Sequence, residues 1–119
     1  MKRDNDLIRT ILATIEDHEF GNRALVLSAS MFVKSFPGLK DGTLNDHIEL
    51  LVNAGFLKAE PHQFGWFILG MTWAGHDFLA NAKCPTIWDK AKQLGGHLAF
   101  DVFATVIKEM TLKSIRDAL

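Results

Sequence analysis

Apolar residues recur at helical spacing in the stretch that follows Asp41-Gly42. They are Leu44, Ile48, Leu51, Val52 and Phe56. This period predicts a helix, with Leu51 buried in the core. Thr43 is placed as the N-cap residue, and Asp46 lies three residues later as a short-armed capping-box partner. Gly55 follows the last turn, where a positive φ is tolerated. The pattern predicts a capped helix from Thr43 to Gly55.

A β-hairpin is predicted directly after this helix. Residues 57–60 form its first strand, residues 61–65 (PHQFG) a polar turn, and residues 66–71 (WFILGM) the return strand. Both faces of the return strand are apolar, whereas a strand of an open antiparallel sheet normally alternates. We therefore expect a later helix or another chain to cover its second face.

Two helices are predicted before this pair of elements. Residues 4–18 carry one apolar stripe, which is typical of an amphipathic helix. Residues 24–29 are a short apolar run that suits a brief strand paired with the hairpin. A second helix then ends near Phe36, because Pro37-Gly38 breaks it. Three helices with a turn between the second and third, followed by a hairpin, predict a winged helix-turn-helix.

Further helices are predicted towards the C-terminus. Thr72 caps a helix that runs from Trp73, facing inward, to about Ala82. Pro85 begins the next helix, where its missing N–H costs nothing, and residues 98–119 form a long final helix.

The predicted fold is mostly α with a small β-hairpin. It is a single winged-helix domain over residues 1–119, with a core at about residues 4–82 and a C-terminal helical extension at about residues 84–119. The chain of 119 residues, 48% of them hydrophobic, suffices for one modest core.

Composition narrows the cellular setting. No apolar run approaches the roughly 20 residues that span a bilayer, and no apolar stretch like that of a signal peptide follows Lys2-Arg3. We therefore expect a cytoplasmic protein without a membrane partner. The net charge is −1, so any basic patch for nucleic acid must be local.

Candidate reactive groups are few. Cys84 is the single cysteine, which excludes an internal disulfide and a multi-cysteine zinc site. None of the five histidines stands at metal-ligand spacing from another histidine or from Cys84, and no glycine-rich phosphate loop follows a strand. We interpret Cys84 as a structural residue rather than a nucleophile. The sequence predicts no metal, no cofactor and no enzymatic activity.

Residues 43–57, TLNDHIELLVNAGFL, resemble the recognition helix of the arsenic-repressor-like winged-helix regulators. The resemblance implies that the start of this helix faces the major groove of DNA. Asn45 and His47 would then lie at the bases, and an asparagine can read adenine through two hydrogen bonds.

A longer resemblance runs along the chain. It is carried by residues 1–9 (MKRDNDLIR), 47–55 (HIELLVNAG), 72–79 (TWAGHDFL) and 87–90 (IWDK). These segments resemble a family of small prophage and bacterial proteins described as a domain of unknown function. The resemblance implies a phage-like origin and a winged-helix-like fold, and it transfers no catalytic or binding residue.

The charged residues on and near the predicted recognition helix bear on whether it binds DNA. Asp46 and Glu49 lie on the predicted recognition helix, where they would meet phosphate repulsion, and phosphate contacts require Lys or Arg. Lys40, just before that helix, is the best-placed cation. The predicted DNA-contacting set is therefore Lys40, Thr43, Asn45, His47, His62 and Gln63.

Two functions are compatible with this pattern. The first is a small phage-type regulator that binds duplex DNA, which is the commonest use of the fold. The second is a winged helix that binds a host or phage protein through its acidic third helix or its apolar wing strand. Fold alone does not choose between them; the first is favoured by a small margin because this fold most often binds DNA, and the acidity of the helix keeps that margin small.

The final helix also offers a broad apolar stripe. A homodimer through this helix would bury the excess and is the commonest oligomer symmetry. The competing account is a monomer in which the final helix folds back over the wing strand. The residues predicted for the dimer interface are Trp66, Phe67, Phe103, Ile107 and Met110.

Overall fold

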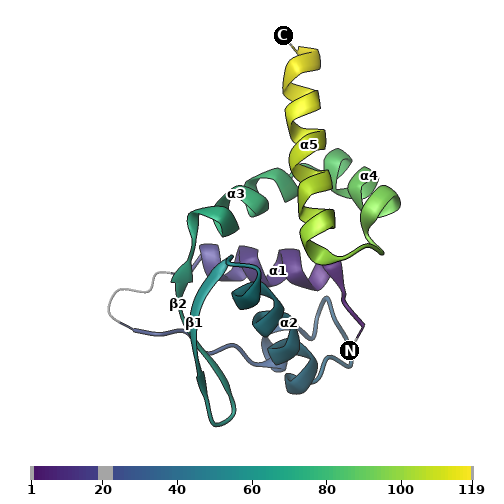
Figure 1. Ribbon diagram of the computed structural model, residues 1–119. Coiled ribbons are helices and arrows are strands. Elements are labelled where there is room, and N and C mark those ends of the chain that lie inside the picture. The colour runs from purple at the N-terminus through teal and green to yellow at the C-terminus, as the bar shows by residue number, and fades with distance from the viewer. Residues whose placement is uncertain (1, 19–22, 119) are drawn as a thin grey trace. The chain divides into compact units, whose positions relative to one another are not determined.

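The computed structural model describes residues 2–18 and 23–118. In chain order the elements are α1 (Asn5–Glu16), the 3-10 helix η1 (Ala29–Phe32), α2 (Asp41–Asn53), β1 (Leu57–His62), β2 (Gly65–Met71), α3 (Trp73–Ala82), α4 (Pro85–Gly95) and α5 (Phe100–Ala118) (Figure 1). The strands form one antiparallel hairpin. A mainly helical fold with a small hairpin is thus confirmed.

Two compact units make up the chain, Met1–Gly75 and His76–Leu119. Their boundary falls inside α3 rather than between residues 82 and 84. The first unit holds α1, α2 and the hairpin, and the second holds α4 and α5. The organisation as a single domain with an extension stays a prediction.

The core of the first unit is built on α1 and α2. Asp4 begins α1 by accepting hydrogen bonds at Oδ1 from the backbone N–H groups of Asp6 and Leu7, at 3.0 and 3.2 Å. The buried residues of these two helices follow helical spacing: Leu7, Ile8, Ile11, Leu12 and Ile15 on α1, and Leu44, His47, Ile48 and Leu51 on α2. Burial of each large apolar side chain contributes about 1.5–3 kcal/mol, so this packing is the main source of stability in the unit.

The start of α2 differs from the prediction. Lys40 is the N-cap residue, and the helix already begins at Asp41. Thr43 is therefore inside the first turn and does not cap. The Asp41 carboxylate accepts a 2.7 Å hydrogen bond from the Ala29 N–H, and this tertiary contact anchors a first turn whose N-cap lies three residues before the predicted one. At the other end Gly55 has φ +81°, as predicted for the residue after the helix.

The predicted second helix is wrong. Only four residues, Ala29–Phe32, are helical, as a 3-10 turn, and turns continue towards Gly38. Ala29 and Phe32 are buried, whereas Met31 and Val33 are exposed. A short helix depends on a packed apolar face for its stability, and this segment buries too few side chains to extend. The assignment as a winged helix is not established by this element.

The hairpin pairs Leu57 with Met71 and His62 with Gly65, so its turn is only two residues, 63 and 64. Leu25 adds one isolated bridge, exchanging both backbone hydrogen bonds with Ile68 at 2.9 and 2.8 Å. The brief strand predicted at residues 24–29 is therefore reduced to a single bridge.

Only one face of β2 is well buried. Ile68 is fully buried, but Phe67 and Leu69 on the other face are 40% and 48% exposed. The expectation that a later element covers this second face is not met by the described residues.

Helix α3 begins as predicted but presents a different face. The Thr72 hydroxyl accepts a 3.1 Å hydrogen bond from the Gly75 N–H and donates to the Gly55 carbonyl at 2.5 Å. A Cβ on Gly75 would overlap the Phe56 carbonyl oxygen. Glycine is therefore required where the first turn of α3 packs against the backbone at Phe56. Trp73 was predicted to face inward, but its side chain is 84% exposed, so that prediction is wrong.

The second unit is held by aromatic packing between its helices. Pro85 is in the first turn of α4, as predicted, and Gly95–Gly96 ends the helix. The Trp88 and Phe103 rings meet at 5.6 Å between centroids, and Phe103 and Ile107 are fully buried. The prediction that Phe103 and Ile107 form a dimer interface is therefore wrong, because both belong to the core.

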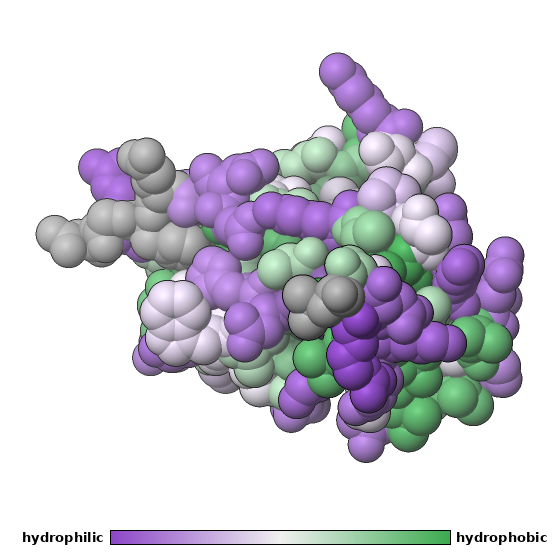
Figure 2. Space-filling model, turned by 90° about the horizontal axis from the view of Figure 1, so that it is seen from above, coloured by the Kyte–Doolittle hydropathy of each residue, from purple (hydrophilic) through white to green (hydrophobic). Residues whose placement is uncertain are grey.

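None of the helices in the described residues has the length and apolar character needed to cross a membrane. Hydrophobic side chains do reach the surface between hydrophilic ones, as Figure 2 shows. The exposed ones with large side chains include Phe64, Trp73, Leu94, Leu112 and Ile115.

Replacement of Leu51 by alanine tests the core of the first unit. Leu51 is fully buried on α2, so we expect Leu51→Ala to lower the free energy of unfolding by about 2–5 kcal/mol. The exposed Leu94 provides a matched control, and Leu94→Ala should change it by less than about 0.5 kcal/mol. Thermal and denaturant unfolding measure both variants, and equal melting temperatures would contradict the assigned packing.

Candidate functional site

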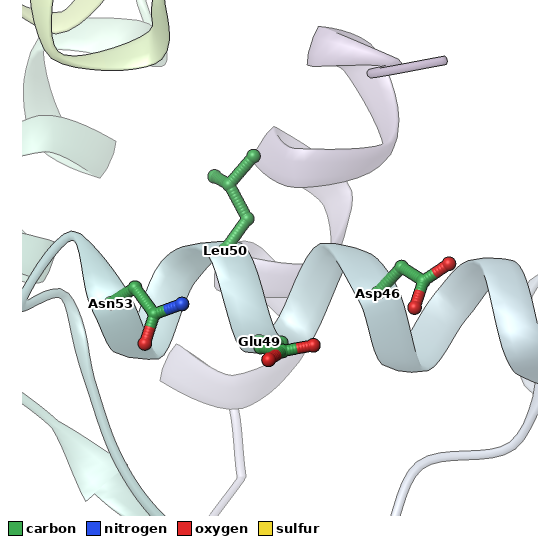
Figure 3. A pocket seen from close by; sticks show the side chains of 4 residues that line it. All are labelled: Asp46, Glu49, Leu50 and Asn53. Atoms are coloured by element: carbon green, nitrogen blue, oxygen red, sulfur yellow. The ribbon is translucent and has the colours of Figure 1, made fainter. Parts of the chain in front are cut away.

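The outward face of α2 is the leading candidate for an interaction site. Asp46, Glu49, Leu50 and Asn53 line a shallow hollow of about 500 Å³ on this face (Figure 3). Their spacing of three, four and seven residues places them side by side along the helix. Asp46, Glu49 and Asn53 are exposed, and Leu50 is half-buried. We call these four residues the acidic face.

Charge on the acidic face has one sign. Asp46 and Glu49 carry carboxylates, and no Lys or Arg occurs between Asp41 and Asn53. The face repels phosphate groups and attracts cationic side chains. Its chemistry therefore suits a basic partner.

Asn45 connects α2 with the hairpin turn. Its side-chain Nδ2 donates a 3.3 Å hydrogen bond to the Phe64 carbonyl. A Cβ on Gly65, whose φ is +157°, would stand 3.0 Å from the Asn45 Oδ1, so the turn passes close over this amide. The amide predicted to read a base instead contacts the turn.

The hairpin turn, whose backbone meets Asn45 of α2, presents an exposed apolar group. Phe64 is 80% exposed, and its neighbour Gln63 is exposed as well. The Asn45 hydrogen bond holds this turn beside the first half of α2. An exposed phenyl ring and two carboxylates are thus presented by neighbouring elements.

His47 is not on the acidic face. It is fully buried, with Nε2 accepting a 2.9 Å hydrogen bond from the Asp4 N–H and Nδ1 lying 2.8 Å from the Thr43 carbonyl. These partners require the neutral imidazole with its proton on Nδ1. The prediction of His47 as a DNA contact is wrong, because position 47 faces α1.

The helical spacing contained the signal for this burial. Position 47 lies three residues after Leu44 and four before Leu51, so it belongs to the same inward stripe. The resemblance to a recognition helix implied that His47 faces outward, whereas the apolar periodicity of the helix indicated that position 47 faces inward.

His62 is also part of the hairpin structure. Its ring stacks on Phe67 with centroids 4.2 Å apart, and its Nδ1 accepts a 3.2 Å hydrogen bond from the Phe64 N–H. It is half-buried, so the imidazole supports the turn. Of the predicted interface, Trp66 and Met110 are half-buried too.

Lys40 and Thr43 lie in a different place from the hairpin residues. They line a groove of about 600 Å³ between the start of α1, the 35–39 turn and the start of α2, with Lys2 at the same groove. Lys40 and Lys2 are exposed. The predicted DNA-contacting residues are thus divided between a groove with two lysines and the hairpin end.

Arg3 contributes little to this groove. Its Nε donates a 2.8 Å hydrogen bond to the Asn5 side chain. Partial burial lowers the pKa of the Arg3 guanidinium from its ordinary value, although an arginine stays charged at neutral pH. Over the described part of the chain, no three His, Cys, Asp or Glu side chains gather as a metal site would require.

Replacement of His47 by phenylalanine tests the buried contact. An aromatic ring would remain, slightly larger than imidazole, but the Asp4 N–H would lose its acceptor and the Thr43 carbonyl would lose its contact with Nδ1. We expect His47→Phe to lower the free energy of unfolding by about 1–3 kcal/mol. His97 is exposed, so His97→Phe is the control and should unfold like the wild type. A fully stable His47→Phe variant would argue against the hydrogen bonds.

Comparison with known proteins places the chain in a family. A protein of Haemophilus influenzae (strain ATCC 51907 / DSM 11121 / KW20 / Rd), named "Uncharacterized protein", is 27% identical over 100% of this chain and 99% of its own length. No solved structure matches the chain. A family model described as "Hypothetical protein (DUF2513)" matches residues 2–97. This confirms the resemblance to a family of unknown function, and the chain belongs to the family described as "Hypothetical protein (DUF2513)".

Proposed function

We propose that the protein is a non-enzymatic, cytoplasmic winged-helix-type module that binds a host or phage protein with a basic surface. The binding surface is the acidic face of α2 together with the exposed Phe64 of the hairpin turn. The observation that carries the proposal is the charge of α2, whose outward face holds Asp46 and Glu49 and no cation.

The arrangement of elements supports a winged-helix-type unit with a shortened second helix. Helix α1 packs beside α2, and α2 leads directly into the β1–β2 hairpin. The Asn45 hydrogen bond to the Phe64 carbonyl holds the turn against α2. One continuous surface can therefore include both the helix and the turn.

The surface has the composition of a small protein-binding site. Leu50 is half-buried among polar neighbours, and Phe64 projects from the turn. Aromatic side chains are enriched in protein interfaces, and complementary charges raise association rates and fix orientation. A cationic segment with an apolar anchor matches this pattern.

DNA fits the same face poorly. Duplex DNA carries one negative charge per about 1.7 Å of its axis, and two carboxylates would be brought against it. Of the residues predicted to read bases, His47 is buried and the Asn45 amide contacts the turn.

A DNA-binding regulator remains the second candidate because of a separate observation. Lys40 and Lys2 are exposed at the groove beside the start of α2. Binding through these residues would rest on phosphate contacts rather than on base readout. A homodimer would place two such grooves on one duplex.

Charge reversal on α2 distinguishes the two candidates. Wild-type protein is titrated with a fluorescent basic peptide that carries one leucine per helical turn, and separately with random duplex DNA. We expect binding to the peptide only. Asp46→Lys with Glu49→Lys should abolish peptide binding, because two attractive charges become repulsive.

A control with the same charge change elsewhere is Asp89→Lys with Asp117→Lys, which replaces two exposed carboxylates outside α2. The dissociation constant of this variant for the peptide should rise by no more than about threefold, because only the long-range electrostatic attraction is weakened. Equal losses in both double variants would show that net charge, and not the acidic face, causes binding.

Lys40→Ala tests the DNA candidate directly. If the groove contacts phosphate, the variant should bind all duplex sequences more weakly, and the slope of log affinity against log salt should fall by about one. Lys58→Ala, an exposed lysine on β1, is the comparison. Unchanged affinity and slope in Lys40→Ala would remove the groove from the DNA hypothesis.

A further inference from the structure

The C-terminal turns of α5 are an apolar surface that α4 does not cover. Helix α5 has 19 residues and α4 has 11, so their lengths are about 28 Å and 16 Å at 1.5 Å per residue. Figure 1 shows the last turns of α5 extending past α4. On these turns Leu112 and Ile115 are 44% and 54% exposed.

Leu112 lies away from the side that packs on α4, and Ile115 lies at the edge of that side. The buried side of α5 holds Phe100, Phe103 and Ile107. Leu112 follows Phe103 by nine residues, two and a half turns at 3.6 residues per turn, and so lies on the opposite side. Ile115 follows Ile107 by eight residues, about 80° around the helix, so it lies at the edge of the buried side, on the turns that extend past α4. Neither residue is among the buried side chains of α5 or among those expected from the sequence to form the dimer face.

Leu112 and Ile115 are spaced as positions a and d of a single heptad, and the preceding a and d positions hold Thr105 and Lys108, so the pairing is limited to one heptad. With Leu112 at position a and Ile115 at position d, Glu109 and Arg116 occupy the two flanking e positions. The opposite flank, position g, holds the small residues Ala104, Thr111 and Ala118. The e flank thus carries one negative and one positive charge. The small residues of the g flank would permit a partner helix to approach closely.

Glu109 and Arg116 are exposed, and neither side chain forms an ion pair within the described residues. In an antiparallel pair of helices, e positions face e positions of the partner. A two-fold axis near residues 112 and 113 then brings Glu109 of each copy beside Arg116 of the other. In a parallel pair the same charges would face Ala104 and Thr111, without complementarity.

We propose that the C-terminal turns of α5 pair with a second copy of this chain in an antiparallel, two-fold arrangement. Leu112 of one copy packs on Ile115 of the other. The charge complementarity of the surface with itself selects a second copy as its occupant, since both signs are presented at equal distances from the axis. A two-fold contact of this kind is self-complementary and closed.

The expected dimer is weak. Two or three helical turns bury less than the roughly 1,200–2,000 Å² of stable interfaces, so association should depend on concentration in the micromolar range. The contact uses no residue of the acidic face or of the groove, and its outcome is independent of the function proposed for α2.

Exchange of the two charges tests the arrangement on the full-length chain. Sedimentation equilibrium should show a mass that rises with concentration towards that of two chains. Glu109→Arg alone and Arg116→Glu alone should each raise the dissociation constant at least about tenfold, because like charges then face each other twice. The double variant Glu109→Arg with Arg116→Glu should return it to within about threefold of the wild type.

Two further variants define the surface. Leu112→Ser should raise the dissociation constant by the same order or more, with circular dichroism showing that the fold is kept. Asp89→Lys changes an exposed charge on α4 and should leave association within about threefold. A monomer at all concentrations, or a double exchange that fails to restore association, would overturn the proposal.

Discussion

The packing of α2 against α1 is the constraint on which the first unit depends. Leu44, Ile48 and Leu51 are buried on one side of α2, and the stripe of α1 is buried with them. The Asp4 N–H donates to His47 within the same contact. A buried backbone donor left without an acceptor costs about 1–3 kcal/mol, so the imidazole allows the start of α1 to lie close to α2. Apolar burial provides the stability of this packing, and the hydrogen bond between the Asp4 N–H and His47 fixes how closely α1 and α2 approach each other.

Use of one side of α2 for the core decides what its other side can do. Asp46, Glu49, Leu50 and Asn53 remain on the outside because the helical period directs them away from α1. The hairpin is then placed by Asn45, whose amide holds the turn beside that outer side. The outward position of the acidic face follows from core packing, and the position of the hairpin turn at α2 follows from one tertiary hydrogen bond.

The exposed lysines and the carboxylates of α2 lie at different places in the first unit. Lys2 and Lys40 gather at a groove near the start of α2, whereas Asp46 and Glu49 follow the helix further along. A chain with net charge −1 in this way presents one acidic surface on α2 and one groove in which two lysines lie beside Asp4. In the second unit, α5 likewise uses one side for the core. Its exposed residues include Leu112, Ile115 and a pair of opposite charges.

The sequence by itself determined the elements whose stability is local or periodic. The stripes of α1 and α2, the Gly55 end of α2, the hairpin, the Thr72 cap and the Pro85 start follow from spacing, positive φ and the missing proline N–H. Only the tertiary structure decided the start of α2, the shortness of η1 and the exposure of Trp73. Each of these depends on a contact between distant residues. Asp41 bonds to Ala29, and Gly75, rather than Trp73, meets the Phe56 carbonyl. The candidate site divides in the same way, because its acidic charge was visible in the chain, whereas the burial of His47 depended on which side of α2 meets α1.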